Sequence, residues 1–183
     1  DKNCYESIRN EYLESIDGLD FKEAFFTDKA LLNFQYIGLI LRALPDSKII
    51  HIKRDAMAIC WSNFKTNFAQ RGIAFSNDLN DLVGFYKLYE EQMNFWHSEF
   101  PNQIYDLKYE SMTKNQTIET KELLNFCNLD WDENCLDFYN NNRSVKTASK
   151  DQVRKKIYSG SSDAWKKYKN YLEPLTNGLV DIN

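Results

Sequence analysis

The sequence predicts an α/β fold with a mostly parallel central sheet. Short runs rich in β-branched residues alternate along the chain with longer segments whose apolar residues recur every three to four positions. The clearest example is the stretch 47–65, SKIIHIKRDAMAICWSNFK, where a strand ends at the charged pair Arg54 and Asp55 and passes directly into a helix. The chain is long enough for one domain, residues 1–183, with a core of its own.

The first third of the chain is expected to hold two helices and two strands. Apolar residues at helical spacing predict a helix over 1–17 and a second, strongly apolar helix over 31–44. The second helix stops before Pro45, because proline lacks the N–H group that a helix interior needs. Short apolar runs predict strands at 21–26 and 47–53.

The rest of the chain is expected to be mainly helical. A helix over 55–68 follows the central strand, and a long amphipathic helix over 77–98 begins at a cap supplied by Ser76 or Asn77. An alternating segment predicts a third strand at 103–108. Shorter helices are expected at 117–127, 134–140 and 163–172, with a polar, irregular segment at 141–161.

Composition and charge exclude several classes of protein. The chain is 43% hydrophobic and 15% aromatic, which argues against a disordered protein. The net charge is −4 and the Lys and Arg residues are spread throughout, so a broad basic face for nucleic acid is not expected. A local basic pocket for a small polyanion is compatible with this overall negative charge. No stretch is long and apolar enough to cross a membrane and no signal peptide is visible, so a cytoplasmic location is expected.

The cysteines and histidines do not form a metal-binding pattern. The chain has four cysteines and two histidines: Cys4, Cys60, Cys127, Cys135, His51 and His97. No CxxC pair is present, so neither a structural zinc site nor another metal is expected. Cys60 is interpreted as a small core residue and His51 as a hydrogen-bonded core histidine. A disulfide between Cys127 and Cys135 stays open.

Polar residues follow each of the three predicted strands, at 27–29, 54–55 and 109–110. In a parallel sheet these strand ends lie along one edge, which is where ligands of open α/β sheets bind. Arg54 presents a planar fork of donors that matches phosphate, and Ser62, eight residues later, adds a hydroxyl donor. Together they suggest a clamp for a phosphate monoester.

Further side chains are candidates for the same edge. Lys29 offers a mobile positive charge and Tyr109 a ring on which a base can stack. The polar loop adds Ser149, Gln152 and Arg154. Each also has a simpler interpretation, in which the charged residues are solvated and the tyrosine belongs to the core.

The same caution applies to the strand-end pair itself. Arg54 and Asp55 would, in the simpler interpretation, cap the following helix and pair locally. None of the six glycines belongs to a P-loop or a dinucleotide-binding motif, and no serine-hydrolase or zinc-protease motif is present. Chemistry in this chain therefore has to be argued from the strand ends.

Residues 27–68 resemble the bacterial sulfotransferase family, to which tyrosylprotein sulfotransferases are related. The stretch reads TDKALLNFQYIGLILRALPDSKIIHIKRDAMAICWSNFKTNF. The similarity continues through Tyr109 and Glu110, FCNLDWDENCLDFY at 126–139 and VKTASKDQVRKKIYSGSSDAWKKY at 145–168. Members of this family use 3′-phosphoadenosine 5′-phosphosulfate (PAPS) and often carry tetratricopeptide repeats. The resemblance implies a P-loop NTPase-like three-layer fold with a central parallel sheet, and transfer of a sulfuryl group from PAPS to a hydroxyl acceptor.

The resemblance also implies roles in binding the co-substrate. Arg54 and Ser62 would hold the 3′-phosphate of PAPS, and Tyr109 would lie beside the adenosine. The segment 152–158, which begins with Gln152 and includes Arg154, would close over the nucleotide.

Two residues would act on the transferred group. Lys29 resembles the lysine that steadies the sulfuryl group in the tyrosylprotein branch, and Ser149 resembles the serine near that group and the nucleotide. Sulfuryl transfer needs mainly in-line positioning and charge stabilisation, so no metal is required.

The chain departs from the family pattern at several points. Ala56 stands where the family has proline, and Thr66 stands where the tyrosylprotein branch has a further arginine. The family's first strand, 5′-phosphosulfate loop and usual glutamate base precede the point at which this chain begins, and helix 1–17 resembles the segment after them. We therefore expect residues 1–183 alone to transfer little or no sulfate. A sheet without its first strand would expose an edge, so association between copies of the chain is left open.

Other functions stay open at this point. One is a non-catalytic module that binds adenosine 3′,5′-bisphosphate, and another is a nucleotide-binding enzyme of the P-loop fold, such as a small kinase. ATP lacks a 3′-phosphate, so a preference for ATP over PAPS would favour the kinase. The acceptor, whether protein tyrosine, carbohydrate or a small hydroxyl compound, is also open.

Overall fold

The chain divides into two compact units, seen in a computed structural model. The structure describes residues 2–17, 24–68, 72–141 and 153–180. Unit 1 comprises residues 1–49 and 89–104, and unit 2 comprises residues 50–88 and 105–183. Three elements contribute residues to both units: β1 (Ile49–Lys53), β2 (Ile104–Lys108) and α4 (Leu79–Glu99).

Unit 1 is helical and has its own hydrophobic core. It contains α1 (Lys2–Asp17), the 3₁₀ turn η1 (Asn33–Tyr36), α2 (Ile37–Ala43) and the last turns of α4. The buried residues of this core are Ile37, Leu41, Met93 and Ile104, and half-buried aromatic and aliphatic side chains surround them. The core thus joins one face of α2 to the end of α4, as the helical spacing of these apolar residues dictates.

Trp96 holds η1 and α2 against the end of α4. Its indole Nε1 donates a hydrogen bond to the carbonyl oxygen of Phe34, 2.7 Å away. A Cβ atom at Gly38 would lie only 2.6 Å from the Trp96 ring, so the two helices approach this closely because residue 38 has no side chain.

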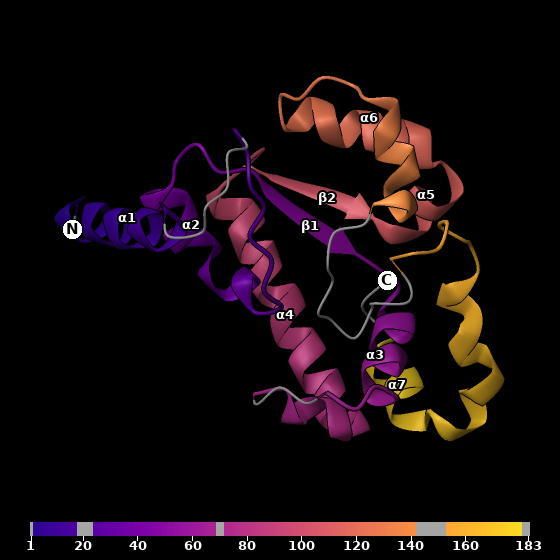
Figure 1. Ribbon diagram of the computed structural model, residues 1–183. Helices are drawn as coiled ribbons and strands as arrows, with labels where there is room; N and C mark the ends of the chain where they lie inside the picture. The colour runs from indigo at the N-terminus through magenta and orange to yellow at the C-terminus, as the bar shows by residue number, and fades with distance from the viewer. Residues whose placement is uncertain (1, 18–23, 69–71, 142–152, 181–183) are drawn as a thin grey trace. The chain divides into compact units, whose positions relative to one another are not determined.

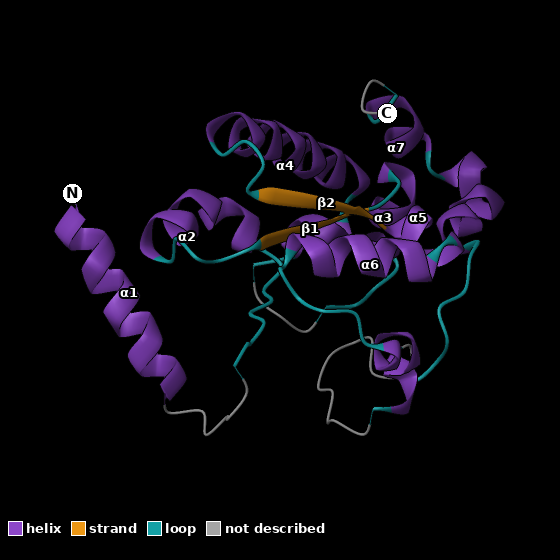
Figure 2. Cartoon of the chain, turned by 90° about the horizontal axis from the view of Figure 1, so that it is seen from above, coloured by secondary structure: helices purple, strands orange, loops and turns teal. Residues whose placement is uncertain are grey.

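Unit 2 contains the sheet and most of the shorter helices. The sheet has two parallel strands in the order β1–β2, drawn side by side in Figures 1 and 2. The helical elements of unit 2 outside α4 are α3 (Ala56–Phe64), η2 (Ala74–Asn77), α5 (Tyr109–Lys114), α6 (Gln116–Phe126), η3 (Glu133–Asn140), η4 (Ser161–Tyr171) and α7 (Glu173–Gly178). Because each strand leads directly into a helix, the carboxyl ends of both strands become helix starts.

The core of unit 2 fastens the C-terminal helices to α3. Cys60, Leu172 and Leu175 are almost fully buried, and α3 packs against both η4 and α7. The rings of Trp61 and Tyr168 lie 4.7 Å apart, which adds an aromatic contact between α3 and η4. This packing brings the start of η4 to the β1–α3 connection.

Most of the predicted elements are confirmed, with shorter bounds. The helices expected over 1–17, 77–98 and 117–127 appear as α1, α4 and α6, and the strands expected at 47–53 and 103–108 appear as β1 and β2. The expected core position of Cys60 is also confirmed.

Several predictions were wrong in detail. Residues 24–26, the described part of the strand expected at 21–26, form no strand, so the described sheet has two strands rather than three. The cap of α4 is Asp78, whose carboxylate accepts from the backbone N–H groups of Asn80 and Asp81, and not Ser76 or Asn77. The helices expected at 134–140 and 163–172 form as the 3₁₀ elements η3 and η4, whereas α7 was not expected.

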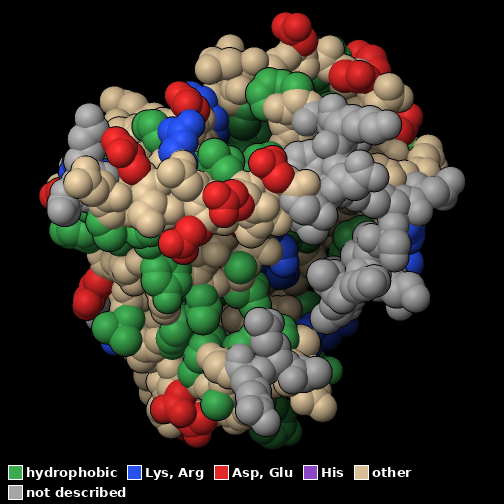
Figure 3. Space-filling view, turned by 60° about the vertical axis from the view of Figure 1, so that its left-hand side comes forward, with side chains coloured by type: hydrophobic (Ala, Val, Ile, Leu, Met, Phe, Trp, Pro, Cys, Tyr) green, Lys and Arg blue, Asp and Glu red, His purple; other side chains and the backbone are tan. Residues whose placement is uncertain are grey.

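Apolar side chains also reach the surface, as the green atoms of Figure 3 show. In unit 1 the most exposed include Phe25, Leu31 and Tyr36, and in unit 2 Ile52 on β1 and Tyr171 at the end of η4. Among the helices that the structure describes, none combines the length and apolarity needed to span a membrane.

Candidate functional site

The candidate site is built around Arg54, the first residue after β1. Its Nε donates to the hydroxyl of Ser162 at 3.2 Å, and its Nη2 donates to the hydroxyl of Ser161 at 3.3 Å. The guanidinium carbon lies 4.7 Å from the centre of the Tyr109 ring, within range of a cation–π interaction. Two hydroxyls and one aromatic ring therefore hold the cation in place.

The strand ends explain why these residues meet. Tyr109 directly follows β2 and Arg54 directly follows β1, and the two strands are parallel neighbours. The carboxylate of Asp55 accepts from the backbone N–H of Ala58 at 2.7 Å and so caps α3. The alternative expectation that Asp55 caps the following helix is therefore confirmed. Arg54 does not cap that helix, because its side chain donates to Ser161 and Ser162 of η4 instead.

The serines reach the site through the turn before η4. Gly160 has φ +91°, a conformation that residues with a side chain rarely adopt, and it sets the direction of Ser161 and Ser162. The Ser161 hydroxyl also lies 3.0 Å from the hydroxyl of Tyr109.

Glu110 links three segments of the site. Its Oε1 accepts a short hydrogen bond of 2.5 Å from the hydroxyl of Ser162 and another of 3.2 Å from the backbone N–H of Asp55. Burial by itself would raise the pKa of Glu110, but these hydrogen bonds and the charge of Arg54 together hold it below its usual range. Glu110 is therefore ionised at neutral pH.

Arg54 has no carboxylate partner in the described ranges. No Asp or Glu oxygen there lies within 4.0 Å of its guanidinium nitrogens, and both of its acceptors are neutral hydroxyls. Arg54 is half-buried, and no fully buried side-chain nitrogen of the described residues lacks a partner. Its two described hydrogen bonds use Nε and Nη2, so the Nη1 end of the guanidinium is available to bind an anion.

The other predicted site residues fall in different places. Ser62 is half-buried on α3, and its backbone carbonyl accepts from the hydroxyl of Thr66. Arg154 is exposed in a turn of unit 2. Ser149 and Gln152 lie outside the described residues.

Lys29 belongs to unit 1 and is exposed on a segment without regular structure. The neighbouring residue, Asp28, accepts a hydrogen bond of 2.9 Å from the hydroxyl of Tyr12 on α1. Burial of the Tyr12 hydroxyl and, to a smaller extent, its hydrogen bond to Asp28 raise the pKa of Tyr12 to about 12. The bond ties the segment that carries Lys29 to α1.

Arg54 and Tyr109 were predicted at this edge of the sheet and do lie in contact, whereas Ser161 and Ser162 were not predicted there. The only signal for these serines is the sequence GSSD at 160–163, a small-residue turn ahead of a predicted helix. That pattern predicts a helix start and does not indicate which distant side chain the hydroxyls will meet.

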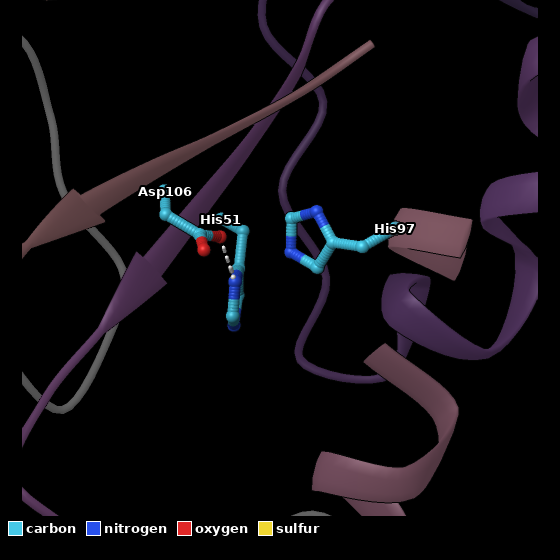
Figure 4. Close-up of side chains that lie close together, drawn as sticks. All are labelled: His51, His97 and Asp106. Atoms are coloured by element: carbon cyan, nitrogen blue, oxygen red, sulfur yellow. Dashed lines mark hydrogen bonds and ion pairs between the residues drawn. The ribbon is translucent and has the colours of Figure 1, made fainter. Parts of the chain in front are cut away.

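His51 lies on β1 and bonds to the neighbouring strand. Its Nδ1 lies 2.6 Å from Oδ1 of Asp106 on β2, the contact drawn as a dashed line in Figure 4. The half-buried ring is thus hydrogen-bonded, in agreement with its interpretation as a satisfied histidine. All four cysteines are free thiols, so the pair Cys127 and Cys135 is not bridged.

Comparison with known proteins identifies the relatives of this chain. The model of the sulfotransferase family matches residues 2–133. An uncharacterized protein of Aquifex aeolicus (strain VF5) is 38% identical over 183 residues, which is 99% of this chain and 24% of that protein. The chain thus spans about a quarter of the length of this relative.

Proposed function

Since the chain belongs to the sulfotransferase family, we propose that it binds PAPS and transfers the sulfuryl group to a hydroxyl acceptor. The observation that carries this proposal is the set of groups that contact the Arg54 guanidinium. Its guanidinium is held at a strand end by Ser161, Ser162 and the ring of Tyr109, without a carboxylate partner among the described residues. A cation held in this way retains its charge for an anionic ligand.

The 3′-phosphate of the nucleotide is the part that Arg54 would bind. A phosphate monoester accepts several hydrogen bonds at once, which suits the free end of a planar guanidinium. Ser62, on the helix that starts after Arg54, would add a hydroxyl. Gln152 and Arg154 would complete the binding of the nucleotide, with Tyr109 on its adenosine side.

Lys29 and Ser149 would act on the transferred group. In the reaction, the bond between sulfur and the bridging oxygen of PAPS breaks, a bond from sulfur to the acceptor oxygen forms, and adenosine 3′,5′-bisphosphate leaves. The positive charge of Lys29 would stabilise the negative charge that develops on the leaving phosphate, and a base would take the acceptor's proton. The P-loop NTPase-like three-layer fold is part of the same proposal.

Isothermal titration with adenosine 3′,5′-bisphosphate tests the binding step. We expect Arg54→Ala to weaken binding by more than about tenfold, because a charged hydrogen bond contributes roughly 1.5–3 kcal/mol. Arg42→Ala is the control, since Arg42 is an exposed arginine of unit 1 that lies over the Phe100 ring. Equal affinity of wild type and Arg54→Ala, or a preference of the chain for ATP, would contradict the proposal.

A non-catalytic bisphosphate-binding module is the second candidate. It is favoured by the contacts around Arg54, which suit the binding of a phosphate and do not by themselves supply the transfer step. A transfer assay with radiolabelled PAPS and a mixture of phenolic and carbohydrate acceptors separates the two. Transfer that is lost in Lys29→Ala while bisphosphate binding is kept supports the enzyme. Since residues 1–183 alone are expected to transfer little or no sulfate, binding without transfer supports the module only where the full-length protein also transfers none.

A further inference from the structure

Ser162 stands between a cation and an anion at the candidate site. Its hydroxyl lies 3.2 Å from Nε of Arg54 and 2.5 Å from Oε1 of Glu110. We propose that Ser162 is a positioning residue that separates Arg54 from Glu110 and thereby keeps the charge of Arg54 available for the 3′-phosphate. This inference rests on the proposed function and adds a specificity-determining residue to it.

The hydrogen positions in this contact follow from the chemistry of the two ends. A guanidinium can only donate and a carboxylate can only accept, so the Ser162 oxygen accepts from Arg54 and its proton goes to Glu110. The same Glu110 oxygen accepts from the backbone N–H of Asp55. Each bond in such a chain polarises the next, so the serine hydroxyl has one preferred orientation.

A direct pair between Arg54 and Glu110 is the alternative that Ser162 prevents. The charge of Arg54 already contributes to the lowered pKa of Glu110, so the two groups interact electrostatically although no ion pair joins them. Without the intervening hydroxyl, the Nε–H group of Arg54 can donate directly to the Glu110 carboxylate in a charge-assisted hydrogen bond. A paired guanidinium would bind phosphate weakly, because the ligand would have to displace a neighbouring carboxylate.

Ser161 and Tyr109 complete the positioning. Ser161 takes one N–H of Nη2 while Ser162 takes that of Nε, so the two serines occupy the same edge of the guanidinium. The Tyr109 ring lies against its face. The Nη1 end of the group is the part left for a ligand.

Four variants test whether Ser162 acts as a spacer between Arg54 and Glu110. Their binding of adenosine 3′,5′-bisphosphate is measured by isothermal titration, with adenosine 5′-monophosphate as the control ligand. Ser162→Ala is expected to weaken bisphosphate binding by about tenfold, and Ser162→Thr, which keeps the hydroxyl, by no more than about threefold. The 5′-monophosphate should bind all variants alike, since it lacks the phosphate that Arg54 would hold. If the role of Ser162 were merely structural, its substitution would weaken the binding of both ligands.

The double variant Ser162→Ala/Glu110→Gln is the decisive one. Without the Glu110 charge, Arg54 has no carboxylate to pair with, so affinity should return to within about threefold of Glu110→Gln alone. Affinity as weak as that of Ser162→Ala, or an unchanged affinity of Ser162→Ala, would overturn the inference. Thermal unfolding checks each variant, and Ser162→Cys, which keeps the side-chain size, replaces Ser162→Ala if the latter does not fold.

The two proposals fail in different ways. If wild type binds no bisphosphate, or Arg54→Ala binds it as well as wild type does, the proposed function itself is wrong. If binding depends on Arg54 and not on Ser162, only the spacer is wrong.

Discussion

Nε of Arg54 donates a hydrogen bond to the hydroxyl of Ser162 at 3.2 Å, although 108 positions separate the two residues in the sequence. This contact joins the end of the first described strand to the start of η4. It depends on the packing of η4 against α3, where the rings of Trp61 and Tyr168 meet. Changes at the site therefore act through both charge and packing.

Arg54→Lys should weaken binding of adenosine 3′,5′-bisphosphate by about tenfold relative to wild type while leaving the fold intact. A lysine keeps the positive charge, but its single ammonium group cannot reach both serine hydroxyls and a phosphate as a planar fork does. Isothermal titration measures the affinity, and circular dichroism checks the fold. A lysine variant that binds as tightly as wild type would show that charge alone is sufficient.

Tyr109→Phe and Tyr109→Leu should differ in their effect on the same affinity. The phenylalanine keeps the ring under Arg54 and loses only the contact between hydroxyls at 3.0 Å, so a change of no more than about threefold is expected. The leucine removes the ring and with it a cation–π contact that contributes about 0.5–1 kcal/mol or more. Equal affinities of the two variants would argue against a role for the ring.

Glu110→Gln should change how stability depends on pH. The folded pKa of Glu110 lies below its ordinary value of 4.5, so its ionised form stabilises the fold above that pH and this stabilisation is lost as the pH falls through the lowered folded value. The difference in unfolding free energy between wild type and Glu110→Gln should therefore shrink from about pH 6 to about pH 3. Urea unfolding at several pH values measures it, and a constant difference would contradict the assigned shift.

Gly38→Ala should destabilise the protein by about 1–3 kcal/mol, because the new methyl group would lie 2.6 Å from the Trp96 ring, which is itself anchored by a hydrogen bond. Gly84→Ala is the matched control. Gly84 lies within α4 and is exposed, and apart from its own helix backbone and chain neighbours no atom lies within 4 Å of the added methyl, so this change should stabilise by about 0.4–1 kcal/mol. Thermal unfolding compares the two, and equal shifts would contradict the packing at residue 38.

Much of the local structure was predictable because it depends on neighbours in sequence. The apolar periodicity of α1, α4 and α6 and the β-branched run of β1 are local signals, and the helices and strand formed where those signals lie. The α4 cap was misplaced by one or two positions, since Ser76, Asn77 and Asp78 are all good capping residues and the chain direction after η2 selects Asp78.

Two of the residues in contact at the described site, Arg54 and Tyr109, were also predictable. Arg54 and Tyr109 were expected together because each follows a strand, and parallel neighbouring strands bring such residues to the same edge. Ser161 and Ser162 were not expected, because their position depends on a turn at Gly160 and on the packing of η4 against α3. Ser62, expected beside Arg54, stays a prediction.

The sequence by itself determined where most of the strands and helices form and that Arg54 and Tyr109 stand at strand ends, because these properties follow from spacing along a short stretch of chain. Only the tertiary structure decided what the Arg54 guanidinium contacts. That choice depends on which of many hydroxyls and carboxylates the packing brings within hydrogen-bond distance. A contact across 108 positions is a property of the packed fold, and no periodicity of the sequence contains it.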